Sequence, residues 1–132
     1  MKEIKLSQLA KLATPFPDRF VETKPGKFSA VYVPHGVVTQ FLLGVCGPYD
    51  FEIGDVIRDA DGTVTGCICT LSVVIDGRDT KIQEVGECEN PSNWKTDGAR
   101  LKACASDGIK RCAMRIGLGL HLWHKHDGNY VL

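Results

Sequence analysis

The chain of 132 residues carries no formal net charge at pH 7, and 43% of its residues are hydrophobic and 24% charged. This length and composition predict a globular protein with one domain, spanning residues 1–132. No apolar run reaches the roughly eighteen residues of a membrane-spanning helix, and the first residues lack the apolar segment of a signal peptide. We therefore expect a cytoplasmic protein without a membrane partner.

The first part of the chain predicts two helices separated by an extended segment. Lys5–Ala13 has apolar residues at helical spacing and is followed by two prolines, which end a helix. Lys27–Val33 is short and extended. The apolar residues of Val37–Val45 suit a second helix that ends between Gly44 and Gly47.

The middle of the chain predicts three β-strands. Tyr49–Arg58, Thr63–Ile75 and Thr80–Glu87 are rich in β-branched residues, and Asp-Gly pairs at 61–62 and 76–77 separate them. An Asp-Gly pair between two strands is a strong hairpin signal. We expect an antiparallel meander.

Residues 94–123 predict one long helix, with a stop signal at Gly117–Gly119. Small and apolar residues recur there every three or four positions, so we expect one buried face made of Ala99, Ala103, Ser106, Ile109, Ala113, Ile116 and Leu120. The predicted fold class is α+β, with an antiparallel sheet of three to four strands packed against this helix.

The same helix carries a basic ridge, because Arg100, Arg111 and Arg115 fall near one another around its axis. Two glycines, Gly98 and Gly108, each cost such a helix about 1 kcal/mol relative to alanine. Their presence indicates close approach of another backbone or of a phosphate chain. The ridge itself suits either anion binding or an ordinary solvated cationic face.

Charge is segregated along the sequence. Residues 1–49 hold six Lys/Arg and three Asp/Glu, residues 50–89 hold three and ten, and residues 90–126 hold seven and two. Such a distribution can focus positive potential on a groove, or let the acidic face of one subunit meet the basic face of another. The alternative is that the acidic middle is the solvated side of a sheet.

Motifs of catalysis are missing from the sequence. There is no P-loop, nucleophile elbow, HExxH or dinucleotide-binding glycine pattern, and Asp59–Gly62 begins like a calcium loop but lacks its later glycine. We therefore expect a turn at 59–62, no cofactor and no enzymatic activity. A less favoured alternative is a small magnesium-dependent nuclease that uses the strand carboxylates Asp55, Asp59, Glu84 and Glu87.

The six cysteines are expected to be reduced, with Cys104 and Cys112 packing as small apolar residues in the helix. A zinc site of Cys67, Cys69, Cys88 and a histidine is the weaker alternative, because its spacing is not that of common zinc motifs. His121, His124 and His126 suit a polar cap or extra phosphate contacts better than metal ligands.

Three segments give the chain a family resemblance. Ser106-Asp107-Gly108-Ile109-Lys110-Arg111, followed by Gly117, is similar to a Thr-Asp-Gly-Leu-Lys-Arg motif on a long helix. Val85-Gly86-Glu87-Cys88 stands where that family has Val-Gly-Tyr-Gly on its last strand. Tyr32–Val38 is similar to the family's Tyr-x-x-Gly-His segment, with glycine and histidine exchanged. From about Phe16 to Gly119 the chain thus resembles the Rad52 family of single-strand annealing proteins, including short phage and mitochondrial relatives.

The resemblance implies a ring-shaped homo-oligomer that holds single-stranded DNA by its backbone and anneals complementary strands without ATP, in recombination, repair or phage replication. It implies a place near the nucleoid of a bacterial or phage-infected cell. An exonuclease or a separate single-strand-binding protein would be a natural partner. By matching positions, Lys110 and Arg111 line the DNA groove, and Lys24 takes the place of an arginine before the first strand. A further arginine of the family falls on Met114, so that contact is either lost or moved to Arg115.

Two more cations of the same helix, Arg100 and Lys102, complete the set of expected DNA-binding residues. A protein that binds single strands without annealing them is the main alternative. The scarcity of aromatic residues in the basic segment, where only Trp94 and Trp123 flank it, argues against a base-stacking surface.

Overall fold

The computed structural model describes residues 7–24 and 30–123. The helices are α1 (Gln8–Ala13), α2 (His35–Cys46) and α3 (Asp97–Arg115), and the strands are β1 (Glu22–Lys24), β2 (Ala30–Tyr32), β3 (Asp50–Arg58), β4 (Val64–Ile75) and β5 (Arg78–Glu87). Short 3₁₀ helices lie at Asp18–Phe20, Pro91–Asn93 and Leu120–Leu122. Within the described residues, no helix combines the length and the apolar character needed to cross a membrane.

The predicted α+β architecture is confirmed. Strands β3, β4 and β5 form an antiparallel sheet in that order, joined by the two expected hairpins. In the first turn the Asp59 carboxylate accepts hydrogen bonds from the backbone amides of Asp61 and Thr63, at 2.9 and 3.0 Å. In the second, Asp76 and Gly77 both adopt positive φ, at 49° and 79°, as a tight hairpin requires. The short pair β1–β2 is a separate sheet, and β1 was not predicted.

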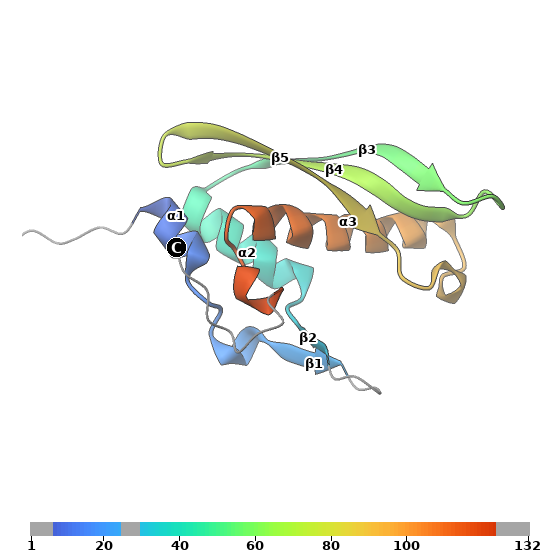
Figure 1. The fold of residues 1–132 in the computed structure, drawn as a ribbon, viewed down its shortest axis with the longest axis horizontal. Coiled ribbons are helices and arrows are strands. Elements are labelled where there is room, and N and C mark those ends of the chain that lie inside the picture. Colours follow the sequence, from blue (N-terminus) through green and yellow to red (C-terminus); the bar gives the residue numbers. More distant parts are fainter. Residues whose placement is uncertain (1–6, 25–29, 124–132) are drawn as a thin grey trace, which may run out of the picture.

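The main helix lies under the sheet. α3 packs on β4 and β5, α2 packs on α3, and α1 packs on α2, so that the sheet and the helices form successive layers (Figure 1). Apolar residues from all layers meet in one core, which includes Leu12 of α1, Leu42 of α2, Leu71 of β4 and Ile109 of α3. The turn between β4 and β5 is also held against α1, because the Asp76 carboxylate accepts hydrogen bonds from the backbone amides of Gln8 and Leu9 at the start of that helix.

The long helix is shorter than predicted at both ends. It begins at Asp97, after Thr96, whose side chain accepts a hydrogen bond from the Ala99 amide at 3.1 Å. Thr96 is therefore the N-cap, and residues 94–96 are not helical. The helix ends at Arg115, and Gly117 follows with a φ of 99°. The stop signal in the sequence was correct, and the extension to Trp123 was wrong.

The buried face of α3 also differs from the expected one. Cys104, Gly108, Ile109, Cys112 and Ala113 are buried, whereas four of the expected residues are only partly buried, namely Ala99, Ala103, Ser106 and Leu120. The physical reason is the closeness of the helix to the sheet. Glycine and cysteine fit this narrow space, and the helix turns them toward β4 and β5.

Two glycines make that close packing possible. A Cβ atom at Gly86 of β5 would overlap the carbonyl oxygen of Cys104, and a Cβ atom at Gly108 would overlap the Cys69 sulfur. The position that such a Cβ at Gly108 would take is 3.6 Å from the Gly86 Cα. Close packing against β5 and the Cys69 side chain therefore explains the glycine at position 108. No phosphate contact is needed to explain it. Gly98 has no such neighbour, since only the Thr96 hydroxyl comes near, at 3.9 Å.

Candidate functional site

Asp107 connects the packing of α3 to its exposed flank. One carboxylate oxygen, Oδ2, accepts a hydrogen bond from the backbone amide of Glu87 at 2.9 Å and another from Arg111 Nε at 2.7 Å. Asp107 precedes Gly108, so the residue that anchors Arg111 sits where the helix touches β5. Partial burial by itself would lower the pKa of Arg111. The hydrogen bond and the negative charge of Asp107 favour the charged guanidinium, and the net shift of the pKa is upward. Arg111 is therefore charged and held in one place.

Two aromatic rings accompany the cations of this flank. The Lys110 ammonium lies 5.7 Å from the centre of the Tyr32 ring, and the Arg111 guanidinium lies 5.1 Å from that of Trp123. All four side chains line a hollow of about 330 Å³, whose floor includes Phe16, Val33, Val38 and Leu118. Glu22, opposite Tyr32 in the β1–β2 pair, raises the pKa of the Tyr32 phenol. The hollow thus combines aromatic surface with two cations and with two carboxylates, those of Glu89 and Asp107.

The remaining expected residues do not join this hollow. Arg100 donates to the carbonyl oxygens of Pro91 and Trp94 and pairs with Asp97, and only 17% of its side chain is exposed. It ties the start of α3 to the preceding 3₁₀ helix. Arg115 forms an ion pair with Glu84 of β5 at 2.5 Å. The expected basic ridge is therefore a row of arginines with acidic partners.

Two lysines complete the expected set. Lys102 is an exposed residue of α3 that does not line this hollow. Lys24 is the last residue of β1, and its side chain lies outside the described part of the structure. Of the six expected residues, the structure brings Lys110 and Arg111 together.

Sequence reasoning missed the aromatic half of the hollow. Tyr32 lies far from Lys110 along the chain, and the fold brings them together because β2 leads into α2, which packs on α3. Trp123 returns to Arg111 because the helix stops at Arg115 and the chain then turns. The Asp107–Arg111 pair could have been found, since aspartate and arginine four residues apart face each other on a helix.

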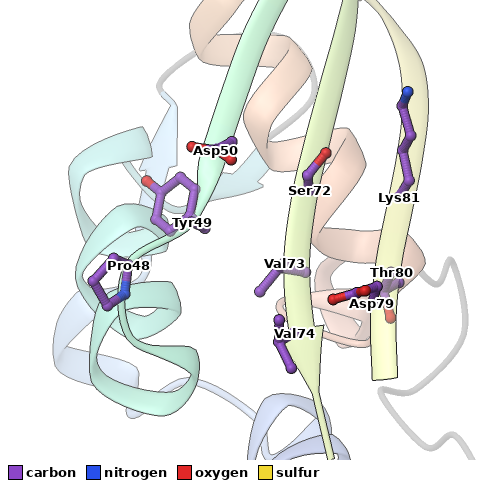
Figure 2. Close-up of a pocket in the computed structure, with 9 residues that line it drawn as sticks. All are labelled: Pro48, Tyr49, Asp50, Ser72, Val73, Val74, Asp79, Thr80 and Lys81. Atoms are coloured by element: carbon purple, nitrogen blue, oxygen red, sulfur yellow. The ribbon is translucent and has the colours of Figure 1, made fainter. Parts of the chain in front are cut away.

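A second hollow, of about 410 Å³, lies on the opposite face of the sheet. Asp50, Ser72 and Lys81 are cross-strand neighbours on β3, β4 and β5, and they line it together with Tyr49 and Asp79 (Figure 2). Its described charges are two carboxylates and one lysine, and it contains none of the residues expected to bind DNA. This hollow is a weaker candidate for an anion site than the flank of α3.

Neither the magnesium nor the zinc alternative has a cluster of ligands in the described part of the chain. No three His, Cys, Asp or Glu side chains come together there in a way that could hold a metal ion. Two of the four carboxylates suggested for magnesium have other partners, because Asp59 caps its own turn and Glu84 binds Arg115. His121 packs against the Phe16 ring at 5.6 Å, and burial lowers its pKa. His124 and His126 lie outside the described residues.

The cysteines are free thiols, as expected, and Cys104 and Cys112 are fully buried in the core. Burial raises the pKa of Cys67 and Cys104 to about 12 and that of Cys112 to about 11. Cys67 Sγ is 3.5 Å from Cys69 Sγ. Thiols with such pKa values stay protonated near neutral pH, as suits side chains that pack in the core.

The comparison with known proteins finds relatives of one kind. No known family model matches the chain. The chain is similar to two single-stranded DNA-binding proteins. It is 33% identical, over an alignment of 131 residues, to the single-stranded DNA-binding protein DdrA of Deinococcus radiodurans, with 91% of this chain and 57% of that protein covered. It is 32% identical over 130 residues to DdrA of Deinococcus deserti, covering 91% and 59%. The chain thus spans little more than half the length of these relatives.

Proposed function

We propose that this chain binds single-stranded DNA on the flank of α3 that carries Lys110 and Arg111. The observation that carries the proposal is the pair of Lys110 and Arg111 beside Tyr32 and Trp123, with Arg111 held by Asp107, in a chain similar to two proteins named for single-stranded DNA binding. Lysine and arginine bind phosphate whatever the base sequence, and exposed aromatic rings accept any base. The site therefore suits single-stranded nucleic acid of any base sequence.

The proposal includes assembly into a ring and a kinship with the Rad52 family. Both outer strands of the described sheet, β3 and β5, have a free edge, and a free edge readily pairs with another chain. Strand β3 is exposed along almost its whole length, including Ile53, Val56 and Ile57. A neighbour placed head to tail on β3 would cover these apolar side chains, and repetition of that contact closes a ring.

The expected activity is ATP-independent annealing of complementary strands, in recombination, DNA repair or phage replication. A ring would place one Lys110–Arg111 pair per subunit along a shared path. Few contacts per subunit then suffice, because linked sites add their affinities through effective concentration. On this proposal the protein is not an enzyme, requires no cofactor and works where single-stranded intermediates arise, in the cytoplasm near the nucleoid.

A binding titration tests the proposal directly. Fluorescence anisotropy with single- and double-stranded oligonucleotides at several salt concentrations should show a preference for the single strand and weaker binding as salt rises. Annealing of complementary strands should persist in EDTA, and mass photometry should show a closed oligomer. A monomer that ignores both DNA forms at low salt would contradict the proposal. Loss of activity on chelation would favour the nuclease instead.

A strand-protecting protein without annealing activity is the second candidate. Tyr32 and Trp123 favour it, because they bring aromatic surface to cations that the sequence leaves without it. Bases held against aromatic rings are less available for pairing. Tight single-strand binding combined with slower annealing than in free DNA would select this candidate.

A further inference from the structure

The flank of α3 carries a second hollow next to the first. It has a volume of about 490 Å³, and Trp94, Asn93, Ser106 and Glu87 contribute to its walls. Glu89, Asp107 and Lys110 line both this hollow and the one at Arg111 and Trp123. The two hollows therefore adjoin at these three residues. We call the combined surface the tryptophan track, bounded by Trp94 and Trp123.

The two tryptophans lie near opposite ends of α3. The backbone of Trp94 is held by a hydrogen bond from Arg100 Nη2 to its carbonyl oxygen at 2.6 Å, and the Arg111 guanidinium lies over the Trp123 ring. Eleven residues separate the two arginines, which corresponds to about 16 Å along a helix axis. This stretch of α3, beside which the two hollows adjoin, is therefore comparable in length to a few nucleotides of an extended strand and longer than a single phosphate group.

Both indole rings are accessible from solvent. The side chains of Trp94 and Trp123 are 42% and 40% exposed. Tryptophan offers a large flat surface, and single-strand-binding proteins commonly stack bases on such rings beside positively charged side chains. Trp123 has the guanidinium of Arg111 next to it, so a base that contacts its ring would bring its phosphate toward that cation.

The charges along the track show that phosphate attraction alone is a poor account of binding. Among the described residues that line it, three carboxylates, from Glu87, Glu89 and Asp107, accompany two cations, Lys110 and Arg111. The Asp107 carboxylate already accepts a hydrogen bond from Arg111 at 2.7 Å. Asp107 positions Arg111, but Glu87 and Glu89 repel phosphate, whereas the stacking of neutral bases on aromatic rings is not opposed by these acids.

We propose that the bound single strand lies along the tryptophan track and that its bases stack on Trp94 and Trp123, so that bases as well as phosphates supply affinity. This inference rests on the proposed single-strand binding and, because stacked bases are less available for pairing, it favours the strand-protecting candidate over annealing. The inferred site differs from one that holds only the sugar-phosphate backbone, because it also contacts the bases. Trp94, Trp123 and the shared wall at Lys110 then belong to one continuous surface.

The test compares two probes with equal phosphate charge: an oligothymidine and an abasic oligonucleotide of the same length. The intact chain should bind the oligothymidine about tenfold or more tightly than the abasic probe, with similar salt dependence. Trp123→Ala and Trp94→Ala should each weaken oligothymidine binding about tenfold and leave abasic binding nearly unchanged. Trp123→Phe and Trp94→Phe are the matched controls, since phenylalanine keeps a stacking ring. Thermal unfolding of each variant checks that the fold is retained.

A further variant separates the two sources of affinity. Lys110→Ala should weaken binding of both probes and flatten the salt dependence, because it removes a phosphate contact. Equal affinity of the intact chain for both probes, or alanine variants that weaken both equally, would overturn the tryptophan track and leave single-strand binding intact. Failure of the intact chain to bind either probe would overturn the proposed function together with this inference.

Discussion

The two sides of α3 differ in what their side chains do. The side toward the sheet is built from small residues, Cys104, Gly108 and Cys112, and it is closed by contact with β4 and β5. The exposed flank carries Lys110 and Arg111, which line a hollow with two aromatic rings. A single short motif, from Asp107 to Arg111, contributes to both sides. Within this motif Gly108 serves packing, and Lys110 and Arg111 are proposed to serve binding. Substitutions at these positions should therefore affect stability and DNA binding separately.

Substitutions at the glycine contact should have the largest effect. Gly108→Ala places a methyl group against the Cys69 side chain, and Gly86→Ala places one against the Cys104 carbonyl. We expect each to lower the free energy of unfolding by about 3 kcal/mol, because the crowded atoms belong to the core or the backbone and cannot move away cheaply. Urea denaturation followed by circular dichroism measures the change.

The matched control lies in the first turn of the same helix. Gly98 has open space around its Cα, so Gly98→Ala should raise stability by up to about 1 kcal/mol through helix propensity. Equal destabilisation by Gly98→Ala and Gly108→Ala would show that the close contact between α3 and β5 is not what requires glycine.

The double substitution Lys110→Ala with Arg111→Ala should separate binding from folding. We expect at least about tenfold weaker single-strand binding, about 1.4 kcal/mol, and a salt-dependence slope that is shallower by about 1.4. Stability should change less than in the glycine variants, because both side chains are only partly buried and the main loss is the ion pair between Arg111 and Asp107. Anisotropy measures the binding, and mass photometry should show an unchanged oligomer. Unaltered affinity in this variant would remove both residues from the site.

Asp107 joins the two sides and should show an intermediate effect on stability. Asp107→Ala removes the acceptor of the Glu87 amide and the ion-pair partner of Arg111, at a cost of about 1 kcal/mol. Asp107→Asn is the control, because its amide oxygen can still accept the hydrogen bond from Glu87. Denaturation curves that place the asparagine variant at the same midpoint as the alanine variant would contradict the role given to that bond.

The smallest expected effect is a pH dependence at the edge of the hollow. Burial lowers the pKa of His121, so the folded chain holds the neutral imidazole and the unfolded chain takes up the proton more readily. The stabilisation is complete above the ordinary histidine pKa of about 6.5 and decreases as the pH falls below it. Urea midpoints at pH 7.5 and 5.5 should differ slightly, and His121→Gln should reduce that difference. If His121→Gln left the difference between the two midpoints unchanged, the pH dependence would come from titratable groups other than His121.

The sheet could be predicted from the sequence because its signals are local. Asp-Gly pairs define the two hairpins, and β-branched runs define the three strands, so β3, β4 and β5 were found within a few residues. The face of α3 was harder to predict. Alanine and serine at helical spacing suggested one buried face, but the contact with β5 needed glycine, and helical spacing alone does not report how close the partner is.

The candidate site could be predicted only in part. Lys110 and Arg111 stand next to each other in a recognisable motif, whereas Tyr32 and Trp123 reach them through tertiary packing that no short stretch of sequence reveals. Arg100 and Arg115 looked equivalent to Arg111 by spacing. The structure gives them different partners, because a helical angle says nothing about which carbonyl or carboxylate lies nearby.

The buried thiols of the core have a practical consequence. Cys67, Cys69, Cys104 and Cys112 are shielded between α3 and the sheet. Thiolates react with alkylating reagents and peroxides, so these side chains become reactive only when the helix separates from the sheet. Their rate of modification in native buffer therefore reports how often this layer opens, and the measurement needs no engineered cysteine.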